Sequence, residues 1–295
     1  MLKKVLAGAA LLALLWMGWR LFVLSGEVDR LSHPTDPPAL ATLELSPAPA
    51  AAMGDERPRL AALAGADGAL GPRVADLEKR LDALTRALRE VEADRDETKA
   101  MLAELTAERA QANEAAALGS SRNVLSAQAQ IQQSAKIDVD ADKTGEYGGF
   151  LEMSGAAAGR MAGILSPAVL SRTFRTLTAA GEAVRSGYLF RIYLPDAHGA
   201  GVGEPQGGFD RGMVDPHLCG TTWCMYAWPV VYGQTGSTTF FMNQNGDVLT
   251  TDAPAYSGSG AGPAPDAAFT ERGKITGPTA NGTKGSDGNI WKQSG

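Results

Sequence analysis

Three aspartates at alternating positions are the residues whose types and spacing come closest to a metal site. Asp138, Asp140 and Asp142 offer carboxylate oxygens, the ligands that Ca²⁺ prefers, and a loop that brings them together predicts a calcium site. An EF-hand loop would continue with a glycine and, at its twelfth position, a glutamate, whereas this chain has Lys143 and Gly149 there. The pattern is therefore degenerate, and an acidic turn in solvent is the alternative interpretation.

The only two cysteines, Cys219 and Cys224, are separated by four residues. In an oxidising compartment they would form a disulfide that staples a local loop. With His217 they could instead supply three metal ligands, one fewer than a structural zinc site requires. A Cys–His nucleophile would lack a third group to orient the base. No other spacing indicates a catalytic pair, so we expect a non-enzymatic protein.

An apolar stretch near the N-terminus determines on which side of a membrane the aspartates and cysteines described above lie. Residues 5–24 are apolar apart from Arg20, and about twenty helical residues span the roughly 30 Å of a bilayer core. Two lysines precede the stretch and Glu27 and Asp29 follow it, which favours an N-terminus inside. A cleaved signal peptide is the alternative, but its apolar core is usually shorter. We expect a single-pass anchor in the inner (cytoplasmic) membrane, with residues 1–4 cytoplasmic and the remainder exported.

Composition limits the partners of the exported part. The chain has 295 residues, of which 44% are hydrophobic and 20% charged, and its net charge is -6. This acidic balance argues against nucleic-acid binding, which needs a basic surface. Without the anchor and polar spacers, about 160 residues remain, enough for one ordinary hydrophobic core.

Two segments are expected between the anchor and that core. Residues 25–72 are rich in proline and alanine and lack aromatic residues, so they predict an extended spacer. Residues 73–112 predict a coiled-coil helix, because apolar residues alternate in steps of three and four and are interrupted only at Arg95 and Thr98. This stripe favours a homo-oligomer, and the alternative is a helix folded back on its own domain. Its members are Val74, Leu77, Leu81, Leu84, Leu88, Val91, Leu102 and Leu105.

Residues 113–295 predict an α+β domain. A glycine-serine stretch at 119–121 suggests a break or bend, after which 123–133 resumes as a helix. Strand-like runs follow, joined by short turns that include a type I′ signal at Asn245 and Gly246. The helix is expected to cover one face of an antiparallel meander, and Tyr256, Phe269 and Trp291 are expected to pin the C-terminal tail across the domain. The strand-like runs are 187–194, 223–232, 238–244 and 247–251.

Six motifs occur in order along this domain: NEAAA at 113–117, LSAQAQ at 125–130, GEYG at 145–148, SGYLF at 186–190, AWP at 227–229 and GSTTFFMNQNG at 236–246. Their order resembles the globular half of type IV pilin-like and major-pseudopilin-like proteins. The resemblance implies a helix-plus-meander fold, a structural or interaction role, and secretion or pilus components as partners. The N-terminus lacks the pilin leader and processing site, so a fixed, membrane-tethered relative is expected. A tethered ligand- or calcium-binding sensor is the alternative function.

Overall fold

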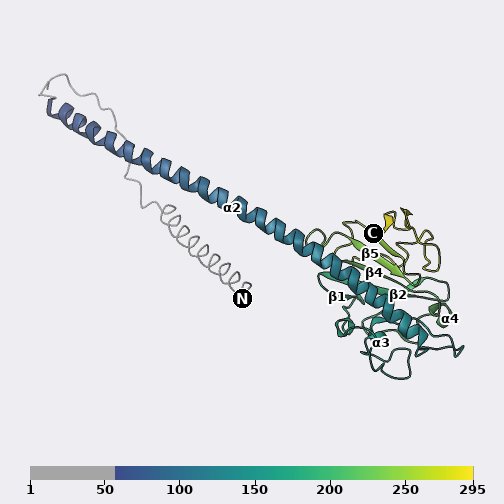
Figure 1. Ribbon diagram of the computed structural model, residues 1–295. Helices are drawn as coiled ribbons and strands as arrows, with labels where there is room; N and C mark the ends of the chain where they lie inside the picture. Colours follow the sequence, from purple (N-terminus) through teal and green to yellow (C-terminus); the bar gives the residue numbers. More distant parts are fainter. Residues whose placement is uncertain (1–56, 295) are drawn as a thin grey trace, which may run out of the picture. The chain divides into compact units, whose positions relative to one another are not determined.

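The computed structural model describes residues 57–294 (Figure 1). The anchor expected at residues 5–24 lies outside this range. Among the described residues, no helix is both long enough and apolar enough to span a bilayer. The chain divides after Lys79 into two units, and apart from the first part of the long helix the features described below lie in the second, Arg80–Gly295.

Helix α2, Arg57–Gln133, is a single continuous helix. It begins before Pro72, so the last part of the expected spacer is helical. The break expected at 119–121 is absent: Ser120 and Ser121 are buried, and their hydroxyls donate to the carbonyls of Ala116 and Ala117 one turn earlier. The segment therefore combines the predicted coiled-coil helix and the predicted domain helix in one element.

The strands form an antiparallel sheet, which confirms the predicted α+β class. Its order in the described part of the chain is β1-β2-β4-β5-β6-β8-β7, with β3 paired to the far end of β2. The strands are β1 Ala183–Arg185, β2 Tyr188–Pro195, β3 Gly201–Gly203, β4 Cys224–Pro229, β5 Thr239–Asn243, β6 Val248–Thr251, β7 Thr283–Lys284 and β8 Ile290–Gln293. The β5–β6 turn is not type I′, which needs two positive φ angles, because only Gly246 has one.

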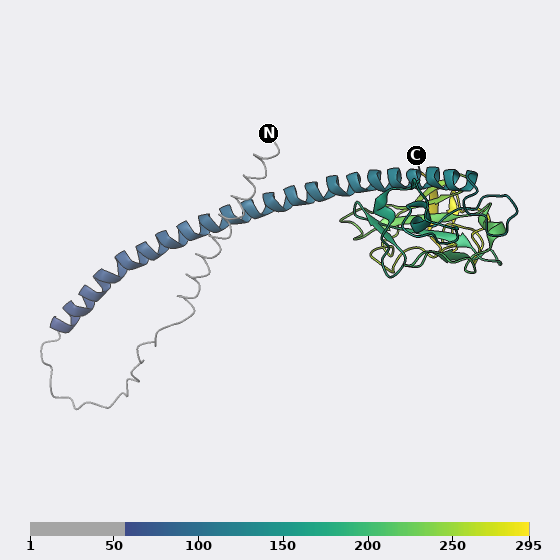
Figure 2. The ribbon, with the colours of Figure 1, turned by 90° about the horizontal axis from the view of Figure 1, so that it is seen from below.

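Both faces of the sheet are buried. On one face, the C-terminal part of α2 contributes Val124 and Ile131 to a core with Phe190, and Figure 2 shows the helix lying along this side of the domain. The other face is covered by the segment after β6, where Trp291 packs 5.7 Å from Tyr226 between ring centroids. The predicted pinning of the tail by Tyr256, Phe269 and Trp291 is confirmed, since all three lie in this second core.

Short helices connect these elements. They are α3 Phe150–Met153, the 3-10 helix η1 Arg172–Phe174, and α4 Pro216–Cys219. The Asp215 side chain caps α4 by accepting from the Leu218 N–H at 2.9 Å. Helix α3 lies beside a group of buried charged side chains, which is described below.

Candidate functional site

A row of exposed apolar side chains runs along α2 before the helix reaches the sheet. We call Leu81, Leu84, Leu88, Val91, Leu102 and Leu105 the leucine face; 48–68% of the surface of each residue is exposed. The alternative of a helix folded back on its own domain is therefore wrong for this segment. A helix in water gains nothing from such a narrow apolar stripe unless another surface covers it.

A polar layer divides the leucine face. Arg95 and Thr98 occupy the two positions of the stripe between Val91 and Leu102. The Arg95 guanidinium is paired with Asp96 on the same helix at 3.1 Å, and the Thr98 hydroxyl donates to the Asp94 carbonyl at 2.8 Å. Any partner that covers the leucine face must therefore also accommodate the polar layer formed by Arg95 and Thr98.

Two side chains fix the point at which α2 joins the domain. Asn113 donates to the Thr235 carbonyl at 3.0 Å, and the Glu114 carboxylate accepts from the N–H groups of Ser237 and Thr238 at 2.7 and 3.1 Å. Hydrogen bonds to a charged carboxylate are stronger than neutral ones. These hydrogen bonds, which we call the helix–loop clamp, hold the loop before β5 against the helix, so the leucine face ends where the domain begins.

A groove lies at this junction. It has a volume of about 640 Å³ and is open to solvent. Leu102 and Thr106 line one side, and Gly233 and Gln234 of the clamped loop line the other. The end of the leucine face therefore borders a hollow surface that is still accessible in the described part of the chain.

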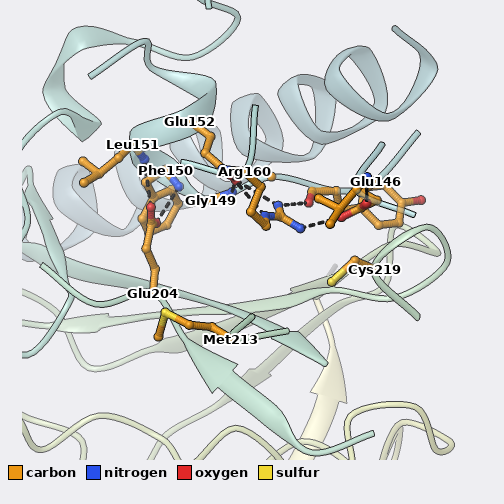
Figure 3. Close-up of polar contacts among 12 residues, drawn as sticks. Glu146, Gly149, Phe150, Leu151, Glu152, Arg160, Glu204, Met213 and Cys219 are labelled. Atoms are coloured by element: carbon orange, nitrogen blue, oxygen red, sulfur yellow. Dashed lines mark hydrogen bonds and ion pairs between the residues drawn. The ribbon is translucent and has the colours of Figure 1, made fainter. Parts of the chain in front are cut away.

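A second feature is internal and was not predicted from the sequence. The buried charge cluster consists of Glu146, Glu152, Arg160 and Glu204, each at most 1% exposed (Figure 3). Arg160 pairs with Glu146 at 2.8 Å and with Glu152 at 2.9 Å. Glu152 belongs to α3 and the other three side chains come from loops, and no motif spacing links the four positions. The one available signal is Glu152, a lone charge in the apolar run FLEM.

Glu204 supports the first turn of α3. Its carboxyl oxygens accept from the N–H groups of Phe150 and Leu151 at 2.5 and 3.0 Å. Burial raises the pKa of Glu204 to about 8, although both hydrogen bonds favour the charged form. Burial likewise raises the pKa of Glu146 above its ordinary value. Because these carboxyl groups are shielded from solvent, they serve packing of the loops and are not placed to meet a dissolved substrate.

The expected calcium ligands come together only in part. Asp140 and Asp142 approach His217 of α4, with one ligand atom of each within 4.8 Å of the others, and all three residues are exposed. Asp138 does not join this group, and its Oδ1 is buried without a hydrogen-bond partner among the described residues. Ca²⁺ takes six to eight oxygen ligands, so two carboxylates and an imidazole are a poor fit.

The expected disulfide is wrong: Cys219 and Cys224 are both free and buried. Cys219 belongs to the core beneath α2, whereas Cys224 belongs to the core on the opposite face of the sheet. Burial raises the pKa of the Cys219 thiol to about 12, which keeps it protonated and unreactive. The rival metal site with His217 also fails, since that side chain is exposed and groups with the aspartates.

Comparison with known proteins identifies the family but no activity. No curated protein matches the chain, and no solved structure does. A family described as "Protein of unknown function (DUF2950)" matches residues 88–261, which include part of the leucine face, the helix–loop clamp and strands β1 to β6. Because this match covers more than half of the sequence, the chain belongs to the DUF2950 family.

Proposed function

We propose that this protein is a non-enzymatic, membrane-anchored envelope protein that self-associates through the leucine face and presents its α+β domain to a secretion or surface assembly. The exposed leucine face is the observation that carries the proposal. Six large apolar side chains on one stripe of an otherwise charged helix need a partner surface, and a second copy offers the same stripe in the same register.

Other features support parts of this proposal. The apolar stretch at residues 5–24 has the length of a bilayer span. The motifs that resemble pilin-like proteins lie in a domain where a helix covers an antiparallel sheet. The alternative, a calcium sensor, draws no support from the three exposed side chains that approach one another.

Self-association is tested on the full chain in a non-ionic detergent by light scattering after size-exclusion chromatography. We expect an oligomer for the natural sequence. Leu88→Asp should weaken association by about 100-fold or more, because burying a leucine is worth about 1.5–3 kcal/mol and the oligomer loses at least two. The matched control is Ala93→Asp, which adds the same charge on the outer face of the helix. A monomeric natural chain at high concentration would refute self-association.

The envelope role is tested separately in cells. The full chain should stay in the membrane pellet after an alkaline wash. In-cell crosslinking followed by mass spectrometry should recover secretion or surface-assembly proteins along with it. Recovery of the protein in the soluble fraction would refute the anchor. Self-crosslinks without other envelope proteins would refute the assembly role but leave self-association standing.

A further inference from the structure

We infer that two copies associate side by side in the same direction, as an in-register two-stranded coiled coil in which Asp94 of each copy faces Lys99 of the other. This inference rests on the proposed self-association and adds its orientation, register and stoichiometry. The leucine face is available for it, because Leu102 and Leu105 remain 64% and 56% exposed with the described domain in place. The domain therefore does not block the stripe where α2 joins it.

The charges beside the stripe complement one another in this arrangement. The first core position of each heptad is occupied by Leu81, Leu88, Arg95 or Leu102. In a parallel, in-register pair, the residue directly before this position faces the partner's residue five places later in the sequence. This rule pairs Asp94 with Lys99, which have opposite charges and are both exposed. The remaining pairs that the same rule gives between residues 80 and 106 contain no two like charges: Arg80 with Thr85, Ala87 with Glu92, and Met101 with Thr106.

The polar layer selects the register. In-register parallel helices place Arg95 opposite Arg95 and Thr98 opposite Thr98, so polar residues meet polar residues, and the two like-charged guanidinium groups must turn outward to water at some cost in stability. A shift by one heptad would place the Arg95 guanidinium against Leu88 or Leu102. A single polar residue at such a core position specifies register at some cost in stability. A pair of helices suits this layer better than three or four helices, because in a pair the long arginine side chains can still extend their charged groups into water.

The same layer disfavours opposite directions. If two antiparallel helices overlap their apolar stripes fully, Arg95 of each copy meets Leu84 of the other, and Thr98 meets Leu81. Four core contacts would then join a polar to an apolar residue, whereas the parallel arrangement confines the polar residues to two layers. A charged group against an apolar partner loses solvation without compensation.

Cysteine crosslinking of the full chain in detergent tests the orientation without the constraint of a shared membrane. Leu84→Cys should form a disulfide with itself on mild oxidation, since residue 84 faces residue 84 in the parallel arrangement. The native Cys219 and Cys224 are buried and should not contribute. Ala93→Cys, on the outer face, is the matched control and should crosslink at least 10-fold less.

The outcomes separate the two levels of the proposal. Antiparallel helices would leave Leu84→Cys uncrosslinked and would instead give a mixed disulfide when it is combined with Arg95→Cys. That result would overturn the inference while self-association stands. A chain that is monomeric by light scattering would overturn both. A natural chain that forms trimers or tetramers would overturn the two-stranded stoichiometry.

A charge exchange tests the pairing of Asp94 with Lys99. Lys99→Asp should weaken association by about 3- to 10-fold, as is typical of exposed ion pairs. Adding Asp94→Lys should restore it to within about 2-fold, because the exchanged charges still attract. Glu97→Lys changes the charge on the outer face and serves as the control. If the double variant is no tighter than Lys99→Asp alone, the two residues are not partners.

Discussion

Arg160→Met should destabilise the protein severely, because it removes the cation from the buried charge cluster. Arg160 is fully buried and pairs with Glu146 at 2.8 Å and Glu152 at 2.9 Å. Breaking a buried ion pair by removing one partner costs about 3–5 kcal/mol, since a charge is left uncompensated. In a domain of this size each kcal/mol lowers Tm by about 2–4 °C, so we expect a fall of roughly 6–20 °C.

The assay is thermal unfolding of the full chain in detergent, followed by fluorescence of the buried Trp223 and Trp228. Exposed Arg172→Met is the control, with an expected effect within about 0.5 kcal/mol. Loss of Arg160 should raise the pKa of Glu146 further, and a folded-state pKa above the unfolded one means that stability is lost as pH rises. The deficit of Arg160→Met should therefore be larger at pH 8 than at pH 5. A cost below about 1 kcal/mol, or a cost independent of pH, would refute the reasoning.

Three further predictions concern other parts of the domain. Stability should fall as pH rises from 4.5 to about 8, because burial raises the folded-state pKa of Glu204 to about 8 from an ordinary 4.5. In thermal melts at several pH values, Glu204→Gln should flatten this dependence of stability on pH, whereas exposed Glu271→Gln should not. Equal slopes in the natural protein and both variants would show that Glu204 does not cause the pH dependence. Glu114→Ala should cost about 1–3 kcal/mol of stability in thermal melts, because two N–H groups lose a charged acceptor. Exposed Glu108→Ala should be nearly neutral. Equal effects of the two substitutions would show that the helix–loop clamp does not stabilise the domain. Millimolar calcium or a chelator should leave Tm unchanged, since the group around Asp140 supplies too few oxygen ligands, and a calcium-dependent rise of several degrees would show a site there.

The sequence predicted those elements in which local periodicity coincides with burial. Strand β2 alternates as expected, with Phe190 and Ile192 in the core beneath α2 and Tyr193 on the opposite face. The helix break at Gly119 was predicted from propensity alone. Glycine costs a helix about 1 kcal/mol, and the buried turns on either side outweigh that cost. Helix propensity therefore predicted the wrong structure at a position where tertiary packing determines whether the helix continues.

The candidate sites depended on long-range contacts, which spacing does not reveal. Cys219 and Cys224 are close in sequence, but α4 ends at Cys219, β4 begins at Cys224, and the two side chains enter different cores. The buried charge cluster joins Glu146 to Arg160 and Glu204 lies far along the chain, so no window of sequence contains it. The leucine face was predictable because all its members lie on one helix, where a repeat of seven residues is read directly.

The segment after β6 buries the second face of the sheet, so the fold cannot be completed before this segment has been synthesised. Synthesis proceeds from the N-terminus, so α2 and β1 to β6 exist before the segment that carries Phe269 and Trp291. Until that segment arrives, Tyr226 and Phe241 present aromatic rings without the partners they meet in the finished fold. Strand β8 then pairs with β6 and completes the sheet. The segment after β6 thus closes the second face, and a chain cut short before it would expose an apolar aromatic surface to its surroundings.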